Sequence, residues 1–588
     1  MKPISSNILS SETGTIRKKW KGRLSVALLY PNTYSLAVSN LGFQLVYSLL
    51  NEQQGVVCER VVYPDAGQRL RSLESNRPLT DFTIVCVSAS FEHDFPRLAG
   101  MLTAGCIEPM AANRPQTIAP GAPLVILGGV AIFMNPEPVA PFADLMVIGE
   151  AEPVLADVFA KLSTGIMKGV KRRNLLSRCA AVRGCYVPSL YTYLYDNDGR
   201  VQKIIVDSGA PVRVKKIVQQ EATCAAHSMQ MSPVAELGMY MTELGRGCSR
   251  GCRFCAAGFI YRPPRLWTGK AIVAAINNRP PHVNRVGLLG MEMADGVTLD
   301  HIAAILQEQQ CALSFSSLRA DRISPQLLDL LAISNLKSVA IAPDGASERL
   351  RRVINKGLLE KDLLSAAEKL VRAGIVHLKL YVMIGLPTET EADLAELIEM
   401  LGRMRQVILA PAKKQGRMPE LTLSVNSFVP KPWTPFQYLS YGGLSTEQAL
   451  ADKSASTAVL ALKKKIRYLR RMIKKLPNIQ LKVDRPERVL EQAVFSRGDR
   501  RLADVLLDIG TGKYTFKQAM RAYGLSSWQY AVRPRSVGEM MCWEVLDHGI
   551  AEGYLYRELE RALREKTTVP CDTSCCKRCG VCGDALEI

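Results

Sequence analysis

Continuous apolar runs alternate with amphipathic segments over the first 160 residues. The predicted strands are RLSVALLYP (23–31), FTIVCVSAS (82–90) and PLVILGG (123–129). The predicted helices between them are LGFQLVYSLLNEQ (41–53) and FPRLAGMLTAGCIE (95–108). Strands without polar alternation are typical of sheets that helices cover on both faces. The pattern predicts a doubly wound α/β domain over residues 1–160.

Two pairs, Gly128-Gly129 and Gly149-Glu150, follow predicted strands of this domain. Doubly wound sheets bind ligands at the carboxyl ends of their strands. Tight turns also need glycine, so both interpretations stay open.

The alternation returns after a mixed connector (161–235). The predicted strands between residues 236 and 445 are VGLLG (286–290), LSFSSLR (313–319), SVAIAPD (338–344), VHLKLYVMIGLP (376–387) and LTLSVNSFVP (421–430). Repeated strand–helix units predict a full or partial (β/α) barrel, with its chemistry at the carboxyl ends of the strands. A basic, mainly helical domain (446–565) and a cysteine-rich tail (566–588) are expected to follow.

The composition is that of a globular chain. Of 588 residues, 47% are hydrophobic and 22% charged, which excludes disorder, collagen and coiled coil. The net charge of +20 permits an anionic partner without requiring one. The apolar run at 124–134 is too short to span a bilayer, and the N-terminus has no apolar signal region. We therefore expect a cytoplasmic protein without a membrane partner.

Three of the sixteen cysteines lie in GRGCSRGCRFCAAG (245–258). Cys248, Cys252 and Cys255 follow a C-x3-C-x2-C spacing. Three thiolates on a short loop can bind three irons of a [4Fe–4S] cluster and leave the fourth open. Zinc is the alternative, but a structural zinc site needs a fourth ligand from elsewhere in the fold.

Five further cysteines lie in VPCDTSCCKRCGVCGD (569–584). Cys571, Cys575, Cys579 and Cys582 are predicted to form a second metal site, with an iron–sulfur cluster favoured over zinc. A disulfide-forming tail is the third alternative. Cys576 directly follows Cys575, so we expect it to point elsewhere unless the backbone turns sharply.

ALKKKIRYLRRMIKKL (461–476) has apolar residues at helical spacing and eight Lys or Arg without an acid. It predicts an amphipathic helix with a cationic face. The face is expected to be solvated, with RNA phosphates or an acidic protein as the alternative partners.

With Phe254 directly before the third cysteine, the loop resembles the signature of radical S-adenosylmethionine (radical SAM) enzymes. Further blocks are similar to cobalamin-binding-domain radical SAM proteins: residues 128–152, 262–265, 317–321, 342–357, 379–393, 428–437, 497–502 and 543–563. The resemblance covers nearly the whole chain. It implies a Rossmann-like cobalamin-binding-type domain, a partial radical SAM barrel and a mainly helical C-terminal domain.

The resemblance also implies roles for single residues. These are cluster binding for Cys248, Cys252 and Cys255, adenine contact for Phe254, amino-group contact for Gly290 and Glu292, carboxylate or ribose contact for Ser317 and Arg319, and support of the adenine by Gly385 with Glu389. The family's Gly-Gly-Glu is not intact at 290–292, and Asp344 stands where a glutamate is expected.

A D-x-H-x-x-G string, whose histidine ligates cobalt in many cobalamin domains, is absent from the sequence. Cobalamin binding without a protein ligand to cobalt and loss of the cofactor are both open. His93, in SFEHDF, is a conceivable axial ligand, although an ordinary loop histidine is the favoured interpretation.

The implied activity is reductive cleavage of S-adenosylmethionine to a 5′-deoxyadenosyl radical, used for methylation or another C–H functionalisation. It also implies an electron donor of the flavodoxin or ferredoxin type. The alternatives are a methylthiotransferase-like tRNA modification enzyme and a non-catalytic, zinc-stabilised RNA- or protein-binding module. The substrate, RNA and protein included, stays open.

Overall fold

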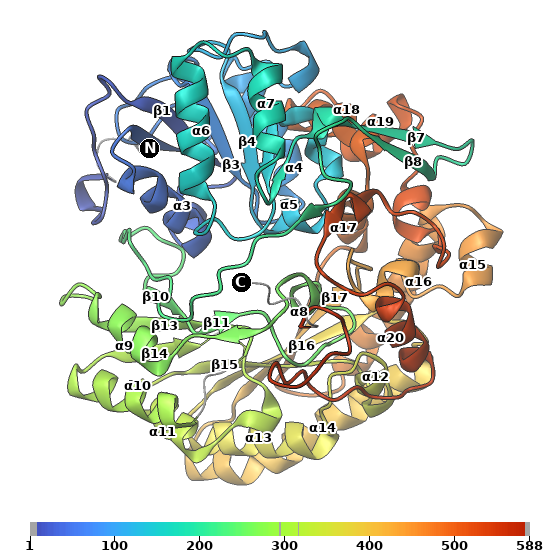
Figure 1. The fold of residues 1–588 in the computed structure, drawn as a ribbon. Helices are drawn as coiled ribbons and strands as arrows, with labels where there is room; N and C mark the ends of the chain where they lie inside the picture. The colour runs from blue at the N-terminus through green and yellow to red at the C-terminus, as the bar shows by residue number, and fades with distance from the viewer. Residues whose placement is uncertain (1–8, 293–295, 316, 583–588) are drawn as a thin grey trace.

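The computed structural model describes residues 9–292, 296–315 and 317–582. The first eight residues of the predicted N-terminal domain and the last six of the predicted tail lie outside these ranges. An N-terminal α/β unit sits above a second α/β unit, and C-terminal helices pack along one side of both (Figure 1). Among the described residues, no helix is both long and apolar enough to cross a bilayer.

The N-terminal sheet runs in the order β2-β1-β3-β4-β5-β6 and is parallel up to the antiparallel β5–β6 pair. Its strands are β1 (Leu24–Tyr30), β2 (Val56–Val62), β3 (Ile84–Ser88), β4 (Leu124–Gly128), β5 (Leu145–Val147) and β6 (Cys185–Tyr186). The chain steps outward from β1 to β2 and then crosses back to β3. This reversal opens a crevice at the carboxyl ends of β1 and β3, where doubly wound sheets bind ligands.

Helices cover both faces of this sheet. They are α2 (Tyr34–Ala37), α3 (Leu41–Glu52), α4 (Asp94–Ala104), α5 (Val130–Met134), α6 (Leu155–Met167) and α7 (Arg172–Ala180). Helix α3 packs beside α6, whereas α4 packs against α18 (Ala503–Gly510) of the C-terminal region. The predicted α/β class of the N-terminal region is confirmed.

The second unit contains two parallel sheets, β10-β13-β14 and β15-β16-β17-β18. The strands are β10 (Tyr240–Glu243), β13 (Arg285–Leu289), β14 (Ala312–Phe315), β15 (Ser338–Asp344), β16 (His377–Ile384), β17 (Glu420–Ser427) and β18 (Ile479–Val483). A parallel bridge between Leu318 and Ile341 joins the two sheets into one curved series. The predicted partial (β/α) barrel is therefore confirmed.

Helices follow the strands along the outside of the barrel (Figure 1). They are α9 (Gly269–Asn277), α10 (Gly296–Glu308), α11 (Pro325–Ile333), α12 (Glu348–Val353), α13 (Glu360–Arg372), α14 (Glu391–Lys414) and α16 (Ala455–Ile473). Because β18 pairs in parallel with β17, α16 and β18 extend the barrel past residue 445, the boundary expected from sequence.

The remaining elements lie mostly in the C-terminal region. They are α15 (Thr446–Ala451), α17 (Pro486–Arg497), α19 (Phe516–Ala522) and α20 (Tyr554–Leu563), with the short strand pairs β7 (Tyr191–Tyr195) with β8 (Val201–Val206) and β9 (Val214–Lys215) with β19 (Leu546–Asp547). In α16 the apolar residues at helical spacing, Leu462, Ile466, Leu469 and Ile473, are buried. Three of its lysines form ion pairs with glutamates of neighbouring segments, so part of the cationic face is neutralised within the chain.

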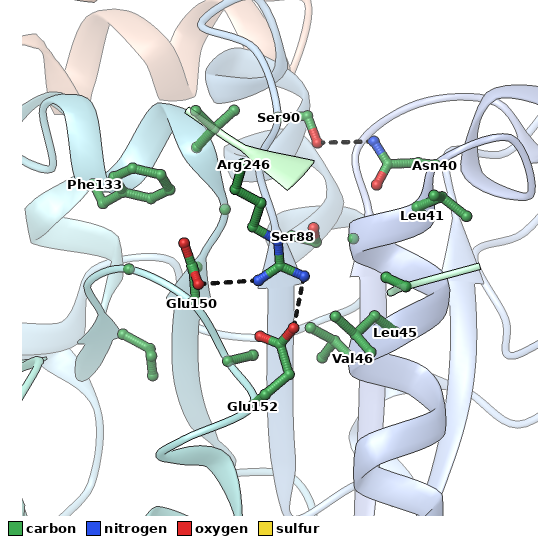
Figure 2. Close-up of a pocket in the computed structure, with 18 of the residues that line it drawn as sticks. Asn40, Leu41, Leu45, Val46, Ser88, Ser90, Phe133, Glu150, Glu152 and Arg246 are labelled. Atoms are coloured by element: carbon green, nitrogen blue, oxygen red, sulfur yellow. Dashed lines mark hydrogen bonds and ion pairs between the residues drawn. The ribbon is translucent and has the colours of Figure 1, made fainter. Parts of the chain in front are cut away.

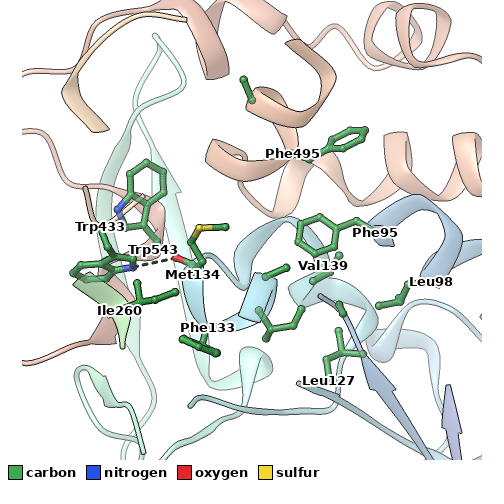
Figure 3. Close-up of a cluster of buried hydrophobic side chains, with 14 of the residues drawn as sticks. Phe95, Leu98, Leu127, Phe133, Met134, Val139, Ile260, Trp433, Phe495 and Trp543 are labelled. Atoms are coloured by element: carbon green, nitrogen blue, oxygen red, sulfur yellow. Dashed lines mark hydrogen bonds between the residues drawn. The ribbon is translucent and has the colours of Figure 1, made fainter. Parts of the chain in front are cut away.

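One apolar cluster joins all three regions (Figure 3). Its members include Phe133 and Met134 of α5, Ile260 and Trp433 of the barrel unit, and Phe495 and Trp543 of the C-terminal region. The Trp433 indole N–H also donates to the Met134 carbonyl at 3.0 Å. Buried aromatic contacts of this size make relative movement of the regions costly.

Gly129 directly follows β4 and has a backbone conformation that requires glycine. Its φ is +105°, and an ideal Cβ would lie 2.3 Å from the Ala89 carbonyl oxygen. The turn interpretation of Gly128-Gly129 is thus correct for Gly129. The neighbouring Gly128 has no such strain, because a Cβ there would meet Val147 O at 3.9 Å.

Gly129→Ala should lower the free energy of unfolding by at least about 1 kcal/mol, because it forces both a strained φ and a backbone clash. Chemical denaturation measures the difference. The control is Gly402→Ala in α14, where a Cβ meets nothing within 4 Å and stability should stay level or rise. Equal stability of the two variants would contradict the prediction.

Candidate functional site

A cavity of about 600 Å³ lies between the carboxyl ends of the N-terminal sheet and the barrel. Gly128, Gly129, Gly149 and Glu150 all line it, so the predicted ligand edge of the sheet faces this space. Apolar side chains of α3 line one side of the cavity and Phe133 lies on the opposite side, while the Asn40 amide donates to the Ser90 hydroxyl at 3.2 Å beside α3 (Figure 2). A large, mostly apolar cavity with a few polar groups is typical of a cofactor site.

Arg246 points into this cavity from the barrel side (Figure 2). Its guanidinium contacts Glu150 at 3.1 Å, Glu152 at 2.6 Å and Glu243 at 2.9 Å. Arg265 binds the same Glu150 at 2.6 Å. This ion cluster ties the strand end of the N-terminal sheet to the residues directly before Cys248.

The ion cluster also controls protonation. Burial by itself would raise the pKa of Glu150, but the hydrogen bond from Arg265 and the charge of Arg246 hold that pKa below its ordinary value. Glu150 therefore stays ionised at neutral pH, and the two arginines keep their partner.

The cysteine loop begins and ends in a short hairpin. β11 (Gly245–Arg246) pairs antiparallel with β12 (Arg265–Leu266), and α8 (Ala257–Ile260) follows Cys255 inside the loop. A Cβ at Gly245 would lie 2.2 Å from Arg265 O, so glycine permits the close pairing. The three cysteines are partly exposed, and Phe254 packs against the main core.

Arg253 holds the loop from inside. Its side chain is 0% exposed and donates to Val353 O at 2.9 Å, to Glu558 Oε2 at 3.1 Å and to Lys566 O at 2.7 Å. Asn355 donates from its amide to Arg250 O at 3.1 Å. The loop is thereby fixed to the end of α12, to α20 and to the start of the tail.

The predicted amino-group ligands lie next to this loop. Gly290 lines the cavity. The Glu292 carboxylate accepts from the Ser249 N–H at 3.0 Å and from its hydroxyl at 2.5 Å. In this structure Glu292 therefore braces the loop one residue after Cys248.

Arg319 and Asp344 lie near Cys252. Arg319 donates to Asp321 at 2.8 Å and to Lys356 O at 2.9 Å, while its Nη1 is buried and meets no partner among the described residues. Lys356 pairs with Asp344 at 2.6 Å. Burial raises the pKa of the Cys252 thiol, and the charges of Lys356 and Arg319 oppose that rise.

The other predicted residues are more scattered. Ser317 is exposed. The Glu389 carboxylate accepts from Gly385 N–H at 3.1 Å and from Lys465 at 2.5 Å, so this pair fixes the end of β16 against α16. His93 lies outside the cavity lining, with its Nε2 3.2 Å from Arg488 O.

The tail packs directly on the cysteine loop. Cys571 N–H donates to Ser249 O at 2.7 Å. Cys576 lies within hydrogen-bonding reach of Cys571, whereas Cys575 is exposed. The backbone turns sharply after Asp572, and the predicted metal site of Cys571, Cys575, Cys579 and Cys582 stays a prediction.

Two family models match the chain. Radical SAM proteins, N-terminal, matches residues 42–188, and the radical SAM superfamily model matches residues 242–401. The chain belongs to the radical SAM superfamily. It is a radical SAM enzyme, and this membership implies a [4Fe–4S] cluster and S-adenosylmethionine as cofactors. The alternative of a non-catalytic zinc-stabilised module is therefore disfavoured.

This radical SAM enzyme is similar to the uncharacterized protein MJ0966 of Methanocaldococcus jannaschii, with 28% identity over 82% of this chain and 90% of that protein. Two solved structures are also similar to this chain. The structure of the methyltransferase TsrM from Kitasatospora setae has a TM-score of 0.47 to this chain at 13% identity, and the match covers 85% of this chain and 98% of that chain. The cobalamin-dependent enzyme OxsB has a TM-score of 0.45 at 13% identity, covering 92% of this chain and 80% of that chain.

Arg246 and Arg253 were not singled out from the sequence. Both lie within residues 245–258, so the signal that the sequence offered was their position beside the predicted cysteine ligands. Their partners are more than 90 residues away along the chain for Glu152 and about 300 for Glu558. Local spacing carries no information on such contacts.

Arg246→Met should lower the free energy of unfolding at pH 7 by about 3 kcal/mol, because it removes the cation paired with Glu152 and Glu243 and one of the two cations paired with Glu150. The pKa of Glu150 is held low, so its contribution to stability is present above its ordinary pKa and is lost as the pH falls. The deficit should therefore shrink below about pH 4.5.

Denaturant titrations at several pH values check this deficit. Arg372→Met is the control, because its ion pair with Glu368 is exposed and is worth less than about 1 kcal/mol. A pH-independent deficit in Arg246→Met would contradict the electrostatic explanation.

Proposed function

We propose that this chain binds a [4Fe–4S] cluster through Cys248, Cys252 and Cys255, binds S-adenosylmethionine beside it, and holds cobalamin in the 600 Å³ cavity to methylate an unactivated carbon of its substrate. The proposal rests on one observation: the cavity lining and the cysteine loop are adjacent along the chain. Arg246 lines the cavity, and Cys248 follows it two residues later. A cofactor in the cavity and a cluster on the loop would therefore share one reaction space.

The loop residues fit a cluster. Cys248, Cys252 and Cys255 lie on one short loop and are partly exposed. A cube is bound at its corners, one thiolate to each of three irons. The three thiols of the loop supply these three ligands and leave the fourth iron open.

Polar groups for S-adenosylmethionine lie beside the loop. The buried Arg319 Nη1, which meets no partner among the described residues, offers a donor for a carboxylate. The Glu292 carboxylate, held by Ser249, offers an acceptor for an ammonium. Phe254 follows two residues after Cys252 and offers an aromatic face for adenine. These roles agree with those that the resemblance implies.

The cavity fits a large, flat, mostly apolar cofactor. Leu41, Leu45, Val46 and Phe133 supply an apolar wall. Gly128 and Gly149 leave its floor without side chains. None of the described lining residues is a histidine, so we expect cobalamin to bind without an imidazole of this chain on cobalt.

When bound, the cluster with S-adenosylmethionine supplies a 5′-deoxyadenosyl radical and cobalamin supplies a methyl carrier. The residues of this chain position the cofactors and close the cavity around them. Arg253 and Asn355 fix the loop, and Arg246 closes the cavity toward the barrel. A one-electron donor of the flavodoxin or ferredoxin type would complete the system.

Anaerobically reconstituted protein should show iron–sulfur absorbance and, when reduced with S-adenosylmethionine, should release 5′-deoxyadenosine. Cys252→Ala should abolish 5′-deoxyadenosine release and remove about four irons per chain, the content of one cube. The matched control is Cys224→Ala, an exposed cysteine outside the loop, which should behave as the parent. Zinc on the loop, with unchanged iron in Cys252→Ala, would refute the assignment.

Cobalamin added to the protein should give the spectrum of the form without a lower imidazole ligand. Gly128→Leu should weaken binding at least tenfold, about 1.4 kcal/mol, because a side chain there enters the cavity without backbone strain. Gly128→Ala is the control and should bind nearly as the parent. His93→Ala should leave the spectrum unchanged, and a shift in that variant would contradict the placement of His93 outside the site.

A further inference from the structure

The start of the tail runs along the cysteine loop through consecutive hydrogen bonds. Arg253 donates to Lys566 O, the Thr568 N–H donates to Asn355 Oδ1 at 2.8 Å, and the Cys571 N–H donates to Ser249 O at 2.7 Å. Thr568 also donates to Glu558 at 2.9 Å. The tail is thus a packed segment of the radical site.

A tight turn then selects one of two adjacent cysteines. The Asp572 carbonyl accepts from Cys575 N–H at 3.3 Å and from Cys576 N–H at 2.8 Å, and its carboxylate accepts from Ser574. The turn brings Cys576 back toward Cys571, and both residues line one small pocket beside Ser249 and Arg262. Cys575 is left exposed.

The last two cysteines approach the same place. Cys579 is 2% exposed and packs with Phe259, Tyr554 and Leu555. Its carbonyl accepts from Ala551 N–H at 2.8 Å. Val581 packs against the same apolar group, and Cys582 follows it directly.

Cations surround this group of thiols. The Arg578 Nε lies 3.2 Å from Cys576 Sγ, and its Nη2 donates to Val569 O at 2.8 Å. Arg262 lies beside Cys579 and donates to the Tyr554 hydroxyl at 3.2 Å. Guanidinium groups stabilise thiolates and compensate the negative charge of a thiolate-bound cluster.

We propose that Cys571, Cys576, Cys579 and Cys582 bind a second iron–sulfur cluster, seated directly on the loop that carries Cys248. The proposal deepens the proposed function, since it places a redox group beside the radical cluster. Four soft thiolates suit zinc as well as iron. The place of these thiols beside the cysteine loop of a radical SAM enzyme, whose chemistry needs electrons, favours iron over redox-inert zinc.

The experiment replaces the three cysteines of the loop, so that any iron that the chain still binds can be assigned to the tail. The full chain carrying Cys248→Ala, Cys252→Ala and Cys255→Ala is purified and reconstituted anaerobically with iron and sulfide. It should retain about four irons per chain, one cube, and show a cluster signal by electron paramagnetic resonance after reduction. Adding Cys576→Ala should remove both the iron and the signal.

Cys575→Ala in the same background is the matched control and should retain about four irons per chain. Loss in Cys575→Ala with retention in Cys576→Ala would overturn the ligand set. Stoichiometric zinc, or no metal, in the triple variant would overturn the second cluster itself. If instead the parent forms no 5′-deoxyadenosine while the triple variant keeps its iron, the proposed function fails and the tail site stands.

Discussion

The cysteine loop depends on the burial of one cation, Arg253. A guanidinium that is 0% exposed must have its N–H groups bonded, because an unpaired buried charge costs several kcal/mol. Its acceptors come from α12, from α20 and from Lys566. The loop can therefore reach its position only when the C-terminal region has packed against the barrel, so α20 and Lys566 support the cysteine loop.

The other end of the same loop is fixed by a different region. Arg246, two residues before Cys248, binds Glu150 and Glu152 of the N-terminal unit. The loop is thus clamped between a carboxylate pair on one side and the C-terminal region on the other. The cavity wall and the cysteine loop cannot shift independently, because each displacement would separate a buried arginine from its partner.

The sequence predicted strands where the apolar run is continuous, and β15 has the bounds predicted for it, 338–344. It gave no sign of β2, because Glu59 and Arg60 interrupt the run. Arg60 can be buried in β2 because it is bonded to Glu12 and Glu74, and a local sequence pattern contains no information on these contacts. The strand β18 was missed for another reason: its apolar residues alternate with Gln480 and Lys482 over five residues, too short a signal.

The site shows the same division between spacing and contact. Spacing alone placed three cysteines on one loop and several cysteines in the tail. It could not distinguish between Cys575 and Cys576, because residue spacing carries no information on where the backbone turns. In the structure the Asp572 carbonyl accepts from the Cys575 and Cys576 N–H groups, and its carboxylate accepts from the Ser574 N–H. This turn leaves Cys575 exposed and brings Cys576 to the pocket that Cys571 and Ser249 also line, an arrangement that residue spacing does not contain.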